Sequence, residues 1–281
     1  TCYNYKPDII MLGHADLISS DQIAELRNDY PNVKFGQWFL DPLNKKGPDY
    51  IRNKSRILDK INNIDASFVT TSPSVLDFLP KNSNNFYIPN PSDDSFETLN
   101  NFLKPCNVDV FFALSHGVHR GVLKSGKIDD RITFLKNLSE KTPDVKFDIY
   151  GIDKIQPIWA DHYFKTIANA KMGLNLSRGD AIKYYSSDRI TQIVGNGLVC
   201  LIDEKTQYRD FFDNSEMVFY KNISDLSEKI LKISRDEKLR KSIGKKGKKK
   251  YMKYFNSTLV ADFIINKTLG RLDKKKYYWH D

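Results

Sequence analysis

The sequence has few of the features that mark secreted, membrane-spanning or metal-binding proteins. Its three cysteines, Cys2, Cys106 and Cys200, are odd in number and lack the spacing of a metal site, which fits a reducing cytosol. No run approaches the roughly 18 apolar residues that a membrane helix needs, and the first residues do not read as a signal peptide. We therefore expect a cytoplasmic protein without a membrane-spanning helix.

The sequence also has no visible internal repeat and no nucleic-acid-binding motif. With 281 residues, 40% hydrophobic and 12% aromatic, the chain can bury the cores of two modest domains or one large one. The net charge of +9 is concentrated late, because residues 241–253 carry seven lysines and residues 274–276 three more. We interpret these lysines first as solvated helix faces and second as a surface attracted to anionic membranes.

Strand and helix patterns alternate along the first part of the chain. Apolar runs predict strands at residues 7–13, 33–40, 66–71 and 86–88. The segments between them predict helices at residues 21–29 and 51–61 and a helical turn at residues 74–79. Strands separated in this way favour a parallel sheet with right-handed crossovers.

The alternation stops at residues 90–107, which have few apolar side chains, and then restarts. The second series predicts strands at residues 108–114, 145–150, 172–176, 198–202 and 217–220. Its predicted helices are residues 130–138, 161–170, 189–195, 224–233, 237–253 and 259–269. We interpret residues 90–107 as a boundary between domains.

The predicted fold is therefore α/β, with two doubly wound domains at residues 1–100 and 101–270 and a basic, aromatic tail at residues 271–281. Because the chain opens at Thr1 without a recognisable domain start, we expect the first domain to lack an N-terminal strand and helix.

Residues 184–203 form the stretch around which the chain is organised. A polar entry leads into a short helix, a Gly-Asn-Gly stop and an apolar strand. A Ser or Asp before the helix can cap it, and Gly197 suits the left-handed position after its end. Arg189 and Gln192 lie on one side of its first turn, where the helix dipole and a guanidinium favour an anion. An ordinary helix–strand unit with an exposed Arg and Gln explains the pattern equally well.

This stretch resembles the C-terminal nucleotide-sugar site of glycosyltransferases with two Rossmann-like domains, the GT-B arrangement. It is most similar to the CgeB-like group, in which an Arg-x-x-Glu helix precedes a small-residue turn and an apolar strand. Arg189 matches the Arg, and Gln192 stands where an acidic residue is usual. In the wider superfamily that acid holds the ribose hydroxyls of the donor, whereas Gln has no charge. The resemblance is clear for residues 108–255 and weaker for residues 7–90.

The loop at residues 115–129 is longer than the roughly 2 to 6 residues usual between a strand and a helix. Its glycines let the backbone approach a phosphate and its cations neutralise one, although no Walker motif is present. The resemblance implies that this loop lies against the donor phosphates. The candidates are His116, Gly117, Arg120 and Lys124. A basic surface loop is the alternative, and a metal site would need a third ligand beside His116 and His119.

Two later loops also follow predicted strands. By resemblance, Gly151 lies where backbone groups hold the donor base, and Trp159 or Ile155 can cover the base or simply pack on the next helix. Residues 177–185 offer charged and hydroxyl groups that suit a leaving phosphate, or form a surface loop. The candidates here are Ser177, Arg178 and Tyr184, with Ser187 just beyond.

In the first half, His14 follows the first strand and Asp41 the second, so both face the cleft between domains. A transferase needs a group that accepts the proton of the acceptor hydroxyl or a carboxylate that stabilises a cationic sugar. Asp41 and His14 are the candidates, with Asp16 behind them. Asp41 is alternatively a turn residue before Pro42.

We expect a metal-independent glycosyltransferase, without a cofactor, that moves a sugar from a nucleotide-sugar donor to a glycan or lipid-linked acceptor such as a surface polysaccharide. Peripheral contact with the inner face of an anionic membrane is compatible with this expectation, and nucleic acid is not an expected partner. The alternative from another class is a nucleotide- or anion-binding module that kept the fold and lost the chemistry.

Overall fold

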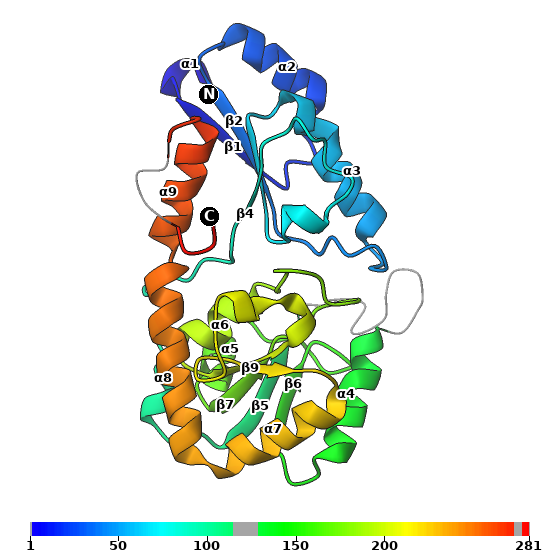
Figure 1. The fold of residues 1–281 in the computed structure, drawn as a ribbon, viewed down its shortest axis with the longest axis vertical. Helices are drawn as coiled ribbons and strands as arrows, with labels where there is room; N and C mark the ends of the chain where they lie inside the picture. The colour runs from blue at the N-terminus through cyan, green and yellow to red at the C-terminus, as the bar shows by residue number, and fades with distance from the viewer. Residues whose placement is uncertain (1, 115–128, 273–276, 281) are drawn as a thin grey trace.

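The computed structural model describes residues 2–114, 129–272 and 277–280, which fold around two separate parallel sheets (Figure 1). The first sheet has four strands in the order β1-β2-β3-β4, and the second has five in the order β6-β5-β7-β8-β9. Every paired strand is parallel to its neighbour. The prediction of an α/β fold with two Rossmann-like domains is confirmed.

The first sheet is covered on both faces. Its elements are α1 (Cys2–Tyr5), β1 (Ile9–Gly13), α2 (Ser20–Asp29), β2 (Lys34–Phe39), α3 (Tyr50–Lys60), β3 (Ala66–Val69) and β4 (Asn85–Tyr87). Because side chains alternate along a strand, Phe35 and Phe39 of β2 share one face, where they pack with Ile23 of α2 and Ile57 of α3. The opposite face lies under α9 (Ser257–Thr268), whose Phe263 contacts the Phe68 ring edge to face at 6.2 Å.

The second sheet is also buried on both faces. Its elements are β5 (Val108–Ala113), α4 (Asp130–Lys141), β6 (Phe147–Tyr150), α5 (Ala160–Ile167), β7 (Ala170–Leu174), α6 (Arg189–Gly195), β8 (Val199–Asp203), β9 (Val218–Tyr220), α7 (Ile223–Arg235) and α8 (Glu237–Tyr254). Along β8, Val199 and Leu201 pack toward α4 and α7, whereas Cys200 and Ile202 pack toward α5, α6 and α8. This alternation explains why β8 is apolar at four successive positions.

The strand order places a topological switch between β5 and β7. The connection after β5 leads to β6 on one side, and the chain then returns to β7 on the other side of β5. In open α/β sheets a ligand binds outside the carboxyl ends of the strands at this point. The candidate site is therefore expected beyond Ala113 and Leu174.

Two described segments that connect the domains, around Ser92 and around Phe255–Ser257, lie side by side. The Ser92 N–H donates to the Phe255 carbonyl at 2.9 Å, and the Ser257 N–H donates to the Ser92 carbonyl at 2.8 Å. In Figure 1, α8 runs along the second domain and continues into α9 beside the first sheet. Residues 257–268 were expected in the second domain, but in the folded chain α9 packs on β2 and β3 of the first sheet.

The remaining differences from the expected elements are local. β7 begins at Ala170, two residues before the predicted start, because α5 already ends at Ile167. Short 3₁₀ turns at Pro73–Val75 and Asn101–Leu103 stand where a helical turn and a linker were predicted. The tail contributes Tyr277 and Trp279 to the core around Phe263, so its aromatic part is packed.

Candidate functional site

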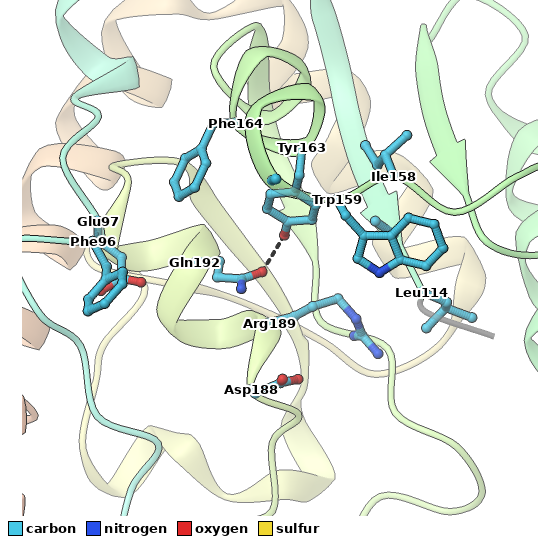
Figure 2. Close-up of a pocket in the computed structure, with 12 residues that line it drawn as sticks. Phe96, Glu97, Leu114, Ile158, Trp159, Tyr163, Phe164, Asp188, Arg189 and Gln192 are labelled. Atoms are coloured by element: carbon cyan, nitrogen blue, oxygen red, sulfur yellow. Dashed lines mark hydrogen bonds between the residues drawn. The ribbon is translucent and has the colours of Figure 1, made fainter. Parts of the chain in front are cut away.

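A cavity of about 380 Å³ opens at the carboxyl end of β5, between α5, α6 and the linker (Figure 2). Its position matches the topological switch of the second sheet. The residues that line it are Phe96, Glu97, Ala113, Leu114, Ile158, Trp159, Ala160, Tyr163, Phe164, Asp188, Arg189 and Gln192. Aromatic rings and a few polar side chains of this kind are typical of a small-molecule site.

The helix that carries Arg189 is short and sharply bounded. α6 starts at Arg189 and ends at Gly195, and Gly197 adopts the expected left-handed conformation with φ of +78°. The expected side-chain cap was wrong: Asp188 has helical backbone angles and makes no capping hydrogen bond. Ser187 is unavailable because its hydroxyl donates to the Asn175 Oδ1 at 2.7 Å.

The Arg189 guanidinium lies in the cavity wall without an anionic partner. Its Nη1 donates to the Leu176 carbonyl at 3.2 Å, and its centre lies 5.0 Å from the Phe112 ring centroid. Among the described residues no carboxylate lies within ion-pair distance of it. Burial, reinforced by the nearby Arg131, lowers the pKa of Arg189 to about 10. The site therefore contains a cation that an incoming anion would stabilise.

Gln192 lies on the same side of α6 as Arg189, as its spacing predicted. The Tyr163 hydroxyl, from α5, donates to the Gln192 Oε1. Burial raises the pKa of Tyr163 above its ordinary value, so this hydroxyl keeps its proton at neutral pH. The amide is therefore oriented with its oxygen toward Tyr163, which leaves its nitrogen as the donor available to a ligand.

Three aromatic side chains surround the cavity and remain exposed. The exposed fractions are 68% for Phe96, 59% for Trp159 and 40% for Phe164. Exposed rings beside a cavity provide faces on which a planar base can stack. Of the two residues considered for that role, Trp159 lines the cavity, whereas Ile155 lies outside its described lining.

Gly151 packs against the backbone of Leu114, a residue of the cavity wall. It has a φ of +74°, and a Cβ added there would lie 1.7 Å from the Leu114 carbonyl oxygen. Only glycine allows this close approach between the loop after β6 and the end of β5. Gly151 thus sets the position of Leu114, which does line the cavity.

Arg178 lies at the contact between the domains. Its Nη1 lies 2.7 Å from the Asp49 Oδ2, and the Asn44 amide of the first domain donates to the Arg178 carbonyl at 3.2 Å. Lys46 and Asp180 form a second ion pair across this boundary, with 3.0 Å between the Nζ and the Oδ2. Ser177 is partly buried at the start of this loop. These contacts hold the 177–185 loop against the first domain.

Tyr184 and Ser187 are not part of the described lining of the cavity. The Tyr184 ring packs against Phe211, with centroids 4.6 Å apart, and its hydroxyl donates to the Asp210 Oδ2 at 2.7 Å. Ser187 is buried against Asn175. Their roles in nucleotide-sugar binding stay predictions.

The first-domain candidates form a cluster at the carboxyl ends of β1 and β2. The His14 Nε2 lies 3.9 Å from the Asp41 Oδ2, and its ring stacks on Phe39 with centroids 5.0 Å apart. Arg56 of α3 forms an ion pair with Asp16 and lies 3.7 Å from the Asp41 Oδ2. Asp41 and His14 are both more than a third exposed, so each is accessible to a substrate.

Tyr185 connects this cluster electrostatically with the cavity. Burial raises the pKa of its hydroxyl, the Arg189 guanidinium opposes the rise, and the Asp41 and Asp188 carboxylates add to it. Asp41 and Arg189, from different domains, therefore both lie within electrostatic reach of one hydroxyl.

Four predicted phosphate-loop residues, His116, Gly117, Arg120 and Lys124, lie outside the described residues. Among the residues that are described, no three His, Cys, Asp or Glu side chains gather as metal ligands would. Within the same ranges, none of the helices combines the length and apolar character needed to cross a bilayer.

Sequence reasoning missed several residues of the cavity. Tyr163 and Phe164 were part of a predicted helix without an assigned role, and Phe96 and Glu97 belonged to the linker. A signal was present in the linker, because Phe96 is a large apolar residue in a polar segment. Its position beside α6 follows only from the folded chain.

The fold and the cavity define a GT-B-like protein with a candidate ligand site in its second domain. Residues 131–266, which include α6 and most of the cavity, match the family described as glycosyl transferase-like. No curated protein matches the sequence significantly.

Solved structures support the fold assignment. A variant of S. aureus TarM, in complex with fondaparinux, α-GlcNAc-glycerol and UDP, is similar with a TM-score of 0.60 and 16% identity over 90% of this chain and 57% of TarM. HepE from Anabaena, in complex with UDP and glucose, has a TM-score of 0.63 and 9% identity over 96% of this chain and 80% of HepE. Sucrose-phosphate synthase from Thermosynechococcus elongatus has a TM-score of 0.58 and 11% identity over 94% and 74%. The chain thus spans little more than half of TarM, and at these identities the likeness shows the fold alone.

Proposed function

We propose that this protein is a glycosyltransferase that moves a sugar from a nucleotide-sugar donor to a glycan or lipid-linked acceptor. The observation that carries the proposal is the Arg189 guanidinium, which lies in the cavity without a carboxylate partner among the described residues. A partly buried cation without a counter-charge is costly, and a bound anion would lower that cost. The family match over residues 131–266 supports the same reading.

The proposed donor is a uridine diphosphate sugar. The exposed rings of Trp159, Phe96 and Phe164 suit a planar base, and Arg189 suits the diphosphate. UDP is our first choice because the similar TarM and HepE structures contain it. GDP and CMP sugars are the other donors to test.

The proposed chemistry uses groups from both domains. Arg189 would stabilise the negative charge that develops on the leaving diphosphate. Asp41, with His14 as the alternative, would accept the proton of the acceptor hydroxyl, because both lie at the carboxyl ends of first-domain strands. Arg56, within 3.7 Å of Asp41, would hold that carboxylate in place.

Several finer assignments belong to the same proposal. We place the protein in the CgeB-like group, with cationic side chains rather than a metal ion on the phosphates. A cytoplasmic location with peripheral contact at the inner face of the membrane is proposed because α8 exposes several lysines, namely Lys238, Lys245, Lys246, Lys249 and Lys253. Such a row is attracted to anionic lipid.

The decisive experiment is isothermal titration of the protein with UDP, GDP and CMP, followed by an assay for hydrolysis or transfer of the corresponding nucleotide sugars. We expect UDP to bind and the Arg189→Ala variant to lose most of that affinity. Binding without turnover on any donor would favour the alternative, a nucleotide-binding module, which the uncharged Gln192 also suits. Absence of nucleotide binding would refute both.

A further inference from the structure

The cavity contains a carboxylate that comes from neither α5 nor α6. Glu97 lies at the end of a turn in the interdomain linker, is only 9% exposed, and lines the cavity. The Asp93 N–H donates to its Oε2 at 2.7 Å. The Glu97 backbone N–H also bonds its own carboxyl group, and in the described part of the chain no Lys, Arg or His side chain lies within ion-pair distance of it. A carboxylate in a cavity wall that has no paired cation can accept hydrogen bonds from a ligand.

A glycine in α6 allows Glu97 to approach this closely. A Cβ added at Gly195 would lie 2.5 Å from the Glu97 Cγ and 2.8 Å from its Cβ. The linker side chain therefore lies directly on the helix that carries Arg189 and Gln192. The contact places a carboxylate from the linker beside α6, a helix that contains no acidic residue of its own.

The polar groups of α6 that line the cavity mainly donate hydrogen bonds. The Arg189 guanidinium can only donate hydrogen bonds. The Gln192 Oε1 already accepts one from Tyr163, so the Gln192 amide nitrogen, a donor, is the group left for a ligand. A ligand with hydroxyl groups also needs an acceptor. Among the described residues that line the cavity, the carboxylates are Asp188 and Glu97.

The positions of the two carboxylates indicate which of them can accept hydrogen bonds from the hydroxyl groups of a ligand. Asp188 is exposed and adjoins Arg189, at the end of the cavity where the phosphates would bind. Figure 2 shows Glu97 on the far side of Gln192 from Arg189, next to Phe96. A carboxylate beside the phosphates would repel them, whereas one at the Phe96 end meets the nucleoside.

We propose that Glu97 binds the ribose hydroxyls of the nucleotide, with the Gln192 amide donating to the same hydroxyls, so that the linker determines the preference for ribose. The inference rests on the proposed function, since it assumes a nucleotide in this cavity. Burial raises the pKa of the Glu97 carboxyl, and the hydrogen bond from Asp93 opposes the rise.

The test compares the affinities of UDP and 2′-deoxy-UDP for the full chain by isothermal titration. The wild type should prefer UDP. Glu97→Gln keeps an acceptor for the Asp93 N–H and removes the charge, so it should weaken UDP binding about 10- to 100-fold. It should weaken 2′-deoxy-UDP binding less, because that ligand offers the carboxylate only the 3′-hydroxyl, so the preference for UDP should fall. The matched control is Asp94→Asn, which removes an exposed carboxylate from the same turn and should change neither affinity.

A preference for UDP that persists in Glu97→Gln, or its absence in the wild type, overturns the assignment while leaving nucleotide binding itself intact. Gln192→Met provides a second test that does not depend on how Glu97→Gln folds. It removes the amide donor but not the carboxylate, so the preference for UDP should become smaller than in the wild type yet remain measurable, and a preference that is unchanged or fully lost contradicts the proposal. If UDP does not bind the wild type at all, the proposed uridine donor fails, and the ribose assignment fails with it.

Discussion

Replacing Arg189 by Ala should separate ligand binding from folding. In the folded protein burial, reinforced by the nearby Arg131, lowers the pKa of this guanidinium from its ordinary value to about 10. At about 1.4 kcal/mol for each pH unit, the charged form is disfavoured by about 3 kcal/mol. Alanine removes that cost but also a hydrogen bond to the Leu176 carbonyl and a cation–π contact with Phe112, which contribute about 2 to 4 kcal/mol together. The free energy of unfolding should therefore change by less than about 2 kcal/mol.

The effect on binding should be much larger. A hydrogen bond between a guanidinium and a phosphate is charge-assisted, and its loss costs about 1.5 to 3 kcal/mol, or about 10- to 150-fold in affinity. A ligand at 100 times its Kd raises the unfolding free energy by about 2.7 kcal/mol. Most of that gain should disappear in the variant at the same UDP concentration.

The pH dependence of stability gives a further check on this reasoning. The folded pKa of Arg189 is lower than its unfolded pKa, so its contribution to stability rises with pH only above about pH 10, until the unfolded chain also loses the proton. Below pH 10 the group is charged in both states and its cost is constant. The difference in unfolding free energy between wild type and variant should thus be flat from about pH 6 to 9.

The assay combines thermal unfolding with isothermal titration, and Arg209→Ala is the matched control. Arg209 is exposed and lies 4.4 Å from the Phe219 ring centroid, outside the described lining of the cavity. It should lose a cation–π contact without losing UDP affinity. The reasoning is refuted if Arg189→Ala unfolds easily yet binds UDP as tightly as the wild type, because Arg189 would then be a structural residue.

Three other outcomes are expected. Asp41→Asn should lower turnover about 10²- to 10⁴-fold in a transfer assay while UDP affinity stays unchanged; full activity would move the proton acceptor to His14, and an equal loss of stability would leave Asp41 a turn residue. Gly151→Ala should destabilise the protein by more than about 1 kcal/mol in urea unfolding, because a Cβ there would lie 1.7 Å from the Leu114 carbonyl oxygen at a φ of +74°; a stability equal to wild type would contradict the close approach. Neutralising the exposed lysines within residues 241–253 should not change turnover on a soluble acceptor but should weaken binding to anionic vesicles; lost turnover would show that they contact substrate.

The alternation of strands and helices could be predicted from the sequence because it depends on neighbouring residues. Residues 198–202 are apolar without a break and follow a glycine, and four of them lie in β8 (Val199–Asp203), whose two faces are covered. Gly197 has the left-handed conformation that its place after a short helix predicted. Arg189 and Gln192, three residues apart, do line one cavity. In each case the required information lies within one or two turns of chain.

Contacts between distant segments could not be read in this way. The prediction of a side-chain cap for α6 was wrong because the Ser187 hydroxyl donates to Asn175 instead. Asn175 follows directly after β7, and its position depends on the fold of the second sheet. Arg178 lies against Asp49 because the domains approach one another, which its own loop does not reveal.

The sequence by itself determined the class of fold, the parallel strands and the helix that presents Arg189, because side-chain periodicity and glycine conformation are local properties of the chain. Only the tertiary structure decided that α9 returns to the first sheet and that Glu97 lies against Gly195 of α6. The physical reason is that both depend on the shape of surfaces formed by segments far apart in the sequence. The absence of a Cβ at Gly195 matters only in the folded chain, where it lets the linker pack directly on α6.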